Sequence, residues 1–128
     1  MVIDTSALAA ILFDEPERTD FVSRIASDGR RLISAATLVE AGILVEARRG
    51  ESAGRELDLL LHRAQVLTVA VDEEQARRAL AAWRAFGKGR HPAALNYGDC
   101  FGYALAHISR QRLLFKGEDF ARTDVARA

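Results

Sequence analysis

Four short apolar segments recur along the chain, and longer stretches with helical periodicity separate them. They are residues 1–4 (MVID), 31–34 (RLIS), 66–71 (VLTVAV) and 112–115 (RLLF). Apolar runs of this length predict buried strands, because a buried helix needs a longer stretch. Strands that alternate with helices favour an α/β fold, in which a mostly parallel sheet is covered on both faces.

The stretches between these strands carry helix signals. Helices are predicted at residues 5–13, 14–29, 35–50, 51–65 and 72–86, and from 96 or 99 onward. Asp14 with Glu17, and Asp72 with Gln75, have the spacing of capping boxes, and Gly50 is a typical helix terminator. The periodicity predicts apolar faces that point into the core, formed by Phe21, Val22, Ile25 and Ala26 and by Ala76, Leu80 and Trp83.

Length and composition limit the class of protein. A chain of 128 residues is expected to form one domain, residues 1–128. No apolar run approaches the ~20 residues of a membrane span, and Asp4 interrupts the apolar N-terminal stretch, so neither a membrane helix nor a signal peptide is expected. The only cysteine, Cys100, excludes an internal disulfide and is typical of the reducing cytoplasm, and a single cysteine with three histidines makes structural zinc improbable.

The charges balance overall but are distributed unevenly. The chain has 18 basic and 18 acidic residues, which argues against a protein that coats nucleic acid without specificity. Residues 77–98, however, contain no acidic residue. The basic side chains of this stretch are Arg77, Arg78, Arg84, Lys88 and Arg90, with His91 beside them. They predict phosphate contacts, although a solvated helix face followed by a loop would have the same composition.

Acidic residues follow the first and last strands. Asp4 ends the first, and Glu118 and Asp119 come shortly after the last. Ligand sites of parallel sheets lie outside the carboxyl ends of the strands, so these residues are expected near a site. Each also has a structural interpretation, since Asp4 is a favoured helix cap and Asp119 follows Gly117 in a turn-like segment.

Two further carboxylates occur in apolar surroundings. Glu40 lies on a helical face with apolar neighbours, although Thr37 could pair with it in a capping box if Ser34 were not the cap. Asp99 is the only charged residue in LNYGDCFGYALAHI, and Asn96 could form a capping box with it.

Taken together, the four carboxylates predict a cation site. If Asp4, Glu40, Asp99 and Asp119 converge, their mutual repulsion requires bound cations. Oxygen ligands without His or Cys favour one or two Mg²⁺ or Mn²⁺ ions. Such ions lower the pKa of a bound water, which can attack a phosphodiester, and this chemistry is consistent with a neighbouring basic loop.

Four motifs resemble those of PIN-domain ribonucleases, and more narrowly those of VapC-type toxins of toxin–antitoxin pairs. The motifs are VIDTSALAAIL, SAATLVEA, LNYGDCFGYALA and LLFKGEDFARTDV, and they span nearly the whole chain. The resemblance implies a three-layer α/β/α sandwich and an endoribonuclease that requires Mg²⁺ or Mn²⁺. It also implies an RNA substrate, a cognate antitoxin whose C-terminal segment blocks the cleft, and a toxin homodimer.

The resemblance also assigns site residues. The acids of the family fall on Asp4, Glu40, Asp99 and Asp119, and supporting polar groups fall on Thr5, Ser6 and Asn96. We expect Arg84, Lys88, Arg90 and His91 to hold the RNA backbone.

Three other functions have related signatures. A phosphorylation-controlled receiver-like domain would also have a lysine after its last strand, as Lys116 is, but it needs an acidic pair after the first strand. An RNA- or partner-binding module without cleavage should have lost one of the four acids. A DNA nuclease could use the same kind of acidic metal site. Such enzymes usually carry extra segments that bind duplex DNA, and 128 residues leave little room for them.

Overall fold

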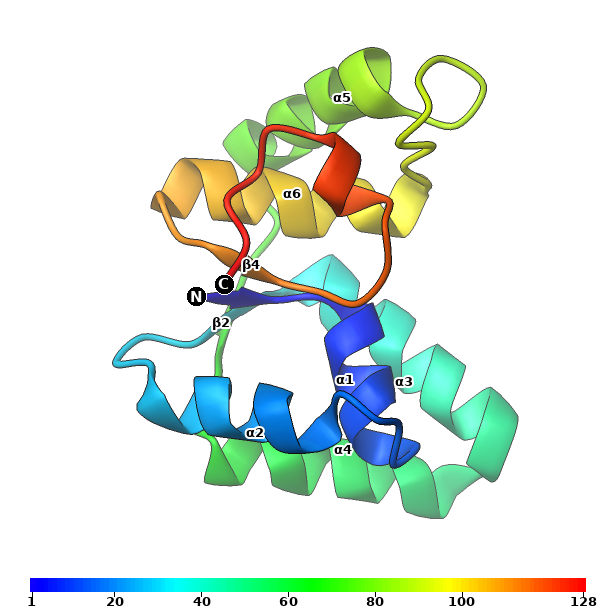
Figure 1. The fold of residues 1–128 in the computed structure, drawn as a ribbon, viewed down its shortest axis with the longest axis vertical. Coiled ribbons are helices and arrows are strands. Elements are labelled where there is room, and N and C mark those ends of the chain that lie inside the picture. The colour runs from blue at the N-terminus through cyan, green and yellow to red at the C-terminus, as the bar shows by residue number, and fades with distance from the viewer.

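The computed structural model describes residues 1–128 and has a four-stranded, fully parallel sheet at its centre (Figure 1). The strands are β1 (Val2–Ile3), β2 (Leu32–Ser34), β3 (Leu67–Val69) and β4 (Leu113–Leu114). Their order in the sheet is β3-β2-β1-β4. The predicted α/β class with a parallel sheet is therefore confirmed.

Helices cover both faces of this sheet, which gives the three layers that the resemblance implies (Figure 1). They are α1 (Thr5–Leu12), α2 (Arg18–Ser27), α3 (Ala35–Arg49), α4 (Glu51–Arg63), α5 (Glu73–Phe86) and α6 (Tyr97–Ser109), with a short 3-10 helix, η1 (Phe120–Arg122). Helices α1 to α4 lie on one face, and α5 and α6 lie on the other. None of the helices combines the length and the apolarity that crossing a membrane requires.

The alternation of side chains along each strand divides the core into two halves. Ile3 and Leu114 pack with α1 to α4, and Val2 and Leu113 pack with α5 and α6. Successive side chains of a strand point to opposite faces, so two neighbouring apolar residues per strand are enough to build both cores.

The two edges of the sheet differ. Beyond β4 the C-terminal residues pair with the strand, because the N–H of Leu113 donates to Ala126 O (2.8 Å) and the N–H of Ala128 donates to Leu113 O (2.9 Å). The other edge is β3. It is shorter than the six residues predicted, and Leu67 is 62% exposed. Since an edge strand pairs on one side only, its apolar sequence overstated its burial.

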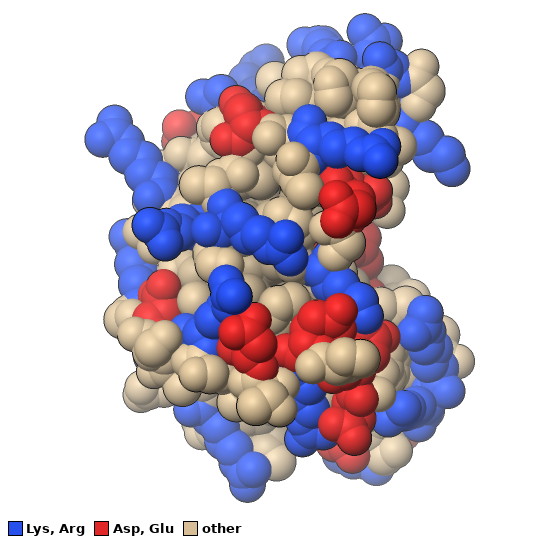
Figure 2. All heavy atoms as spheres, viewed as in Figure 1, with Lys and Arg blue, Asp and Glu red and all other residues tan.

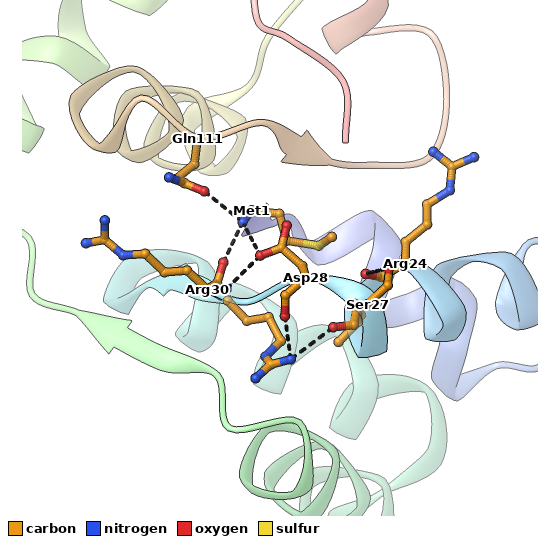
Figure 3. A network of polar contacts seen from close by, with 8 residues as sticks. Met1, Arg24, Ser27, Asp28, Arg30 and Gln111 are labelled. Carbon is orange, nitrogen blue, oxygen red and sulfur yellow. Dashed lines mark hydrogen bonds and ion pairs between the residues drawn. The ribbon is translucent and has the colours of Figure 1, made fainter.

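The amino group of Met1 connects three segments at the amino ends of the strands (Figure 3). It donates to Asp28 Oδ1 (3.1 Å), Arg30 O (2.5 Å) and Gln111 Oε1 (3.0 Å). These contacts join β1 to the loop before β2 and to the loop before β4. The register of the central strands is thereby reinforced at their amino ends.

The predicted start of the second helix is wrong. Asp14 has a positive φ of 55° and forms an ion pair with Arg18 (3.1 Å), while α2 begins only at Arg18. Glu17 is the N-cap residue and makes no capping hydrogen bond with its side chain, because it pairs with Lys116 instead. On this helix Phe21 and Ile25 are buried as predicted, but Val22 is 42% exposed.

The predicted inward face of α5 is also wrong. Leu80 and Trp83 are 48% and 39% exposed, and the buried residues are Gln75, Ala79 and Ala82. The buried Gln75 side chain explains the rotation, since it donates to Ala70 O (3.2 Å) and accepts from the hydroxyl of Ser34 on β2. A small, partly polar face thus packs inward, and the large apolar side chains line the surface.

Candidate active site

Asp4 follows β1 and is almost completely buried, at 2% exposure. It caps α1, as its structural interpretation predicts: Oδ2 accepts from the backbone N–H of Ser6 (2.9 Å) and from its hydroxyl (2.6 Å). Its other oxygen, Oδ1, is buried and has no hydrogen-bond partner. Burial, together with the negative charge of Glu40, raises the pKa of Asp4 despite the bonds from Ser6. One carboxylate oxygen thus holds the helix while the other is left free for a ligand.

Ser6 links this carboxylate to the end of β4. Its hydroxyl accepts from the backbone N–H of Lys116 (3.0 Å) while it donates to Asp4. The backbone N–H of Asp4 in turn donates to Leu114 O (3.0 Å). The hydroxyl of the neighbouring Thr5 is buried without a partner. Of the two hydroxyls that the resemblance assigns to the site, Ser6 is therefore the one that orients Asp4.

Asp99 belongs to the capping box at the start of α6. Its Oδ2 accepts from Asn96 N–H (2.9 Å), and its own N–H donates to Asn96 Oδ1 (2.9 Å). Burial, opposed by the bond from Asn96 and reinforced by the charges of Asp4, Glu40 and Asp119, raises the pKa of Asp99 to about 7. The structural interpretation of Asp99 as part of a capping box is therefore correct, and the charges that act on its carboxylate come from the other three predicted acids.

Glu40 reaches the same cluster from α3. The N-cap residue of this helix is Ser34, which excludes a capping box between Thr37 and Glu40. The Glu40 carboxylate lies against the first turn of α6: a Cβ placed on Gly98 would be 1.4 Å from Glu40 Oε2. Its charge raises the pKa of both Asp4 and Asp99. Glu40 is thus held beside the start of α6 and not in open solvent.

Asp119 lies on the exposed segment after β4, just before η1. It is one of the carboxylates whose charge raises the pKa of Asp99. This coupling favours Asp119 over the neighbouring Glu118 as the fourth acid.

The four acids therefore converge from different elements at the carboxyl ends of the strands. Acidic atoms gather around the notch on the right of the molecule in Figure 2, where the strands end in Figure 1. No three Asp, Glu, His or Cys side chains lie close enough to form a ready-made metal cage. The donors nevertheless fit a hard cation, because all are carboxylate oxygens and Asp4 Oδ1 is buried without a partner.

A second charged group lies beside the cluster but is already paired. Lys116 forms ion pairs with Glu15 and with Glu17 (3.0 Å). Hydrogen bonds to the two glutamates raise the pKa of Lys116, and the bond from Lys116 lowers the pKa of Glu17. This side chain therefore anchors the loop between α1 and α2 to the end of β4.

The predicted basic residues lie at the end of α5 and in the loop that leads to α6. Arg84, Lys88 and Arg90 are exposed. The guanidinium of Arg90 stacks over the Trp83 ring (4.9 Å to its centroid). His91 is engaged within the loop, since its Nδ1 accepts from the Ala93 N–H (3.0 Å). Arg84 and Lys88 are thus available to a ligand, whereas Arg90 also donates to Arg84 O (3.2 Å) and one nitrogen of His91 bonds within the loop.

Two features of the site are absent from the predicted set. One is Gly98, whose missing side chain makes room for Glu40; a glycine in the first turn of a buried helix is the signal that could have indicated it. The other is an apolar surface beside the cluster, formed by α3, α5 and α6. Its exposed members are Val39, Ile43, Leu80, Trp83 and Tyr97.

Comparisons with known proteins agree with this arrangement. The PIN domain family model matches residues 1–126. Ribonuclease VapC30 of Mycobacterium tuberculosis is 60% identical over 126 residues, which cover 98% of this chain and 96% of the relative.

Two solved structures share the fold. The crystal structure of the sarcin-ricin loop cleaving toxin VapC20 of Mycobacterium tuberculosis has a TM-score of 0.80 at 17% identity, covering 99% of this chain and 97% of that one. A chain of a toxin–antitoxin complex from Klebsiella pneumoniae has a TM-score of 0.70 at 18% identity, covering 96% and 92%. Because the family model matches nearly the whole chain and the relative VapC30 is 60% identical over 126 residues, the chain belongs to the PIN domain family, among the VapC ribonucleases.

Proposed function

We propose that this protein is a metal-dependent endoribonuclease and the toxin of a toxin–antitoxin pair. The observation that carries the proposal is the convergence of Asp4, Glu40, Asp99 and Asp119, whose mutual charges help to raise the pKa of Asp99 to about 7. A cluster of this kind destabilises the folded chain unless cations neutralise it. The names of the close relatives support RNA as the substrate.

Mg²⁺ or Mn²⁺, when bound, would supply an acidic water and neutralise charge on the phosphate oxygens. Asp4 and Asp99 are the proposed principal ligands, with Glu40 and Asp119 beside them. The protein prepares them differently: Ser6 fixes the orientation of Asp4, and the cap with Asn96 fixes that of Asp99. Both carboxylates are therefore held in place before an ion arrives.

The substrate backbone is proposed to run along the basic segment after α5. Arg84, Lys88 and Arg90 are exposed, and the segment leads directly into Asn96 and the first turn of α6. Phosphates bound there would be near the acidic cluster, while the cluster itself repels RNA in the absence of cations. Cellular RNA as substrate is consistent with action in the cytoplasm.

Two protein partners are proposed. A cognate antitoxin is supported by the fold shared with a chain of a toxin–antitoxin complex. A homodimer is supported by the apolar surface of α3, α5 and α6, where Ile43 is 67% and Tyr97 is 80% exposed. Tyr97 stands between two hollows of about 330 Å³ and 260 Å³, both lined mainly by apolar side chains. A second copy of the chain would cover this surface. Its exposed apolar residues form a continuous patch, whereas apolar residues scattered singly over a surface need no partner.

The decisive experiment is cleavage of total RNA by the purified, antitoxin-free protein. We expect discrete fragments with Mg²⁺ or Mn²⁺, none with chelator, and a loss of about 100-fold or more in Asp4→Asn. Asp58→Asn is the matched control, because Asp58 is exposed on α4, a helix that carries none of the four acids. DNA of the same sequence, assayed in parallel, separates ribonuclease from deoxyribonuclease activity.

Retained RNA binding without cleavage by well-folded protein would contradict the proposal and favour an RNA-binding module. Cleavage that persists in chelator would contradict the metal requirement alone. Mapping the fragment ends would identify the RNA that is cut.

A further inference from the structure

Gly98 and Glu40 are packed more closely than any side chain at position 98 would permit. Gly98 is the second residue of α6, and Glu40 projects onto it from α3. A Cβ at position 98 would be 1.4 Å from Glu40 Oε2 and 2.4 Å from Glu40 Cδ. Both distances are far below contact, so even alanine would displace the carboxylate. The bare Cα of Gly98 is the surface against which this end of Glu40 lies.

Other glycines on the same two helices lack such a close contact. Gly102 lies one turn further along α6, where a Cβ would be 3.4 Å from Asp4 Oδ1, an ordinary contact distance. A Cβ on Gly42, on the same helix as Glu40, would meet nothing within 4 Å. Helical glycine lowers helix stability relative to alanine. The space taken by Glu40 is a physical reason for that residue at position 98, and no such reason applies at position 42.

The chain also contains a second glycine–glutamate contact, between α3 and α4. A Cβ on Gly54 of α4 would be 2.1 Å from Oε1 of Glu46 on α3. Glu46 is exposed and lies six residues beyond Glu40 on α3, which places the two side chains on different faces of the helix and about 9 Å apart along its axis. The same substitution at position 54 therefore displaces a glutamate without touching the site.

We propose that Gly98 is a positioning residue for the reaction: its missing side chain places the Glu40 carboxylate beside Asp99 and Asp4. The inference rests on the proposed nuclease function. A methyl group at position 98 leaves the fold intact, because the displaced atoms are the end of a flexible side chain. The carboxylate of Glu40 then turns away from the cluster, and the site loses one of its oxygen donors toward a cation.

The test compares Gly98→Ala with Gly54→Ala. We expect Gly98→Ala to melt no lower than the wild type, to cleave RNA about 10- to 100-fold more slowly, and to bind Mn²⁺ more weakly by calorimetry. Gly54→Ala should retain both cleavage and Mn²⁺ affinity. A crystal structure of metal-free Gly98→Ala should show the Glu40 carboxylate displaced while Asp4 and Asp99 keep their positions.

A shortened acid tests whether Gly98 acts through Glu40. Glu40→Asp retracts the carboxylate by one methylene, which leaves room for a methyl group on residue 98. We expect Glu40→Asp alone to weaken cleavage, and Gly98→Ala to cause little further loss in that background. In a Glu40→Gln background, Gly98→Ala should likewise have little further effect.

Equal losses from Gly98→Ala in all three backgrounds would overturn the inference, because Gly98 would then act independently of Glu40. So would wild-type cleavage and Mn²⁺ affinity in Gly98→Ala, or a crystal structure with Glu40 undisplaced. If the wild-type protein cleaves no RNA, the proposed function fails. The Mn²⁺ affinities and the crystal structure still decide whether Gly98 positions Glu40.

Discussion

At the scale of single residues, the structural and chemical roles of the acids coincide. Asp4 is the N-cap of α1 and Asp99 completes the capping box of α6 with Asn96, and both carboxylates also belong to the acidic cluster. A cap fixes a carboxylate by bonding one of its oxygens to backbone N–H groups, which leaves the other oxygen available. Capping therefore supplies the preorganisation that an ion-binding carboxylate needs.

The pKa of Asp99 predicts how stability depends on pH. Because it is raised from 3.8 to about 7, the folded protein retains a proton between those values that the unfolded chain has released. The stability contribution of Asp99 is therefore most favourable at low pH and declines as the pH rises toward 7. We expect the metal-free protein to lose stability between about pH 4 and pH 7, and Asp99→Asn to reduce that loss by about 4 kcal/mol. Denaturant melts at several pH values, in chelator, measure both.

Asp99→Asn should also abolish cleavage, since the amide is a poor ligand for a hard cation. The matched control is Asp20→Asn, because Asp20 pairs with Arg24 on the exposed surface of α2. A strong loss of stability in Asp99→Asn at every pH would show that the cap outweighs the repulsion within the cluster.

Ser6→Ala tests the orientation of Asp4. The change removes the hydroxyl that donates to Asp4 Oδ2 and leaves the N–H of Lys116 without its acceptor. We expect cleavage about tenfold slower and stability about 1 kcal/mol lower. Ser109→Ala, which removes a hydroxyl bonded to Leu105 O at the other end of α6, should cost stability without slowing cleavage. Equal activity in the two variants would exclude an orienting role for Ser6.

At the scale of elements, α6 and the loop before it contribute to both parts of the proposed site, the acidic cluster and the basic segment that would bind RNA. The helix contributes Asp99 and Gly98, and the loop contributes Lys88 and Arg90. Because both belong to one continuous segment, the distance between the basic loop and the acidic cluster is fixed by the backbone.

The basic loop between α5 and α6 predicts how the affinity for RNA depends on salt concentration. In Lys88→Ala with Arg90→Ala, each lost phosphate contact should reduce the slope of log affinity against log salt by about 0.7 for single-stranded RNA. Binding assays with the metal-free protein at several salt concentrations measure this slope. Arg55→Ala with Arg63→Ala on α4 changes the net charge equally and should leave the slope unchanged. Identical slopes for both variants would place the RNA path elsewhere.

At the scale of the whole molecule, the sheet order brings the acids together. β1 and β4 are neighbours in the sheet although more than half of the chain separates them, so Asp4 and Asp119 follow adjacent strands. Glu40 and Asp99 arrive from helices on opposite faces of the same sheet. The parallel sheet thus brings four distant parts of the sequence to the carboxyl ends of its strands.

The proposed homodimer can be tested with one substitution on its apolar surface. Ile43→Glu introduces a charge at a residue that is 67% exposed, so the monomer should remain folded while self-association weakens by about tenfold or more. Sedimentation of both proteins over a range of concentrations measures this. Leu59→Glu, on α4 and 45% exposed, is the control. A wild-type protein that remains monomeric at every concentration would exclude the homodimer, and loss of antitoxin binding by Ile43→Glu would assign the surface to the antitoxin.

The sequence by itself predicted the class of fold and the four acids. Strand segments such as residues 1–4 and 112–115 are recognisable because local apolar runs report burial directly. Asp72 as a helix cap and Gly50 as a terminator were predicted for the same reason, since both depend on the backbone of their own segment. Glu40 and Asp99 were noticed because a charge in an apolar stretch is conspicuous, whereas Asp4 and Asp119 were noticed because they follow predicted strands.

The tertiary structure decided what depends on neighbours from distant parts of the chain. Leu80 and Trp83 have the periodicity of a buried face, yet the bond between Gln75 and Ser34 turns α5 so that they lie outside. Gly98 has no side chain, and its importance arises only because Glu40 of another helix lies against it. Local sequence determines which elements form, whereas the packing of elements determines which of their faces are buried and which side chains meet.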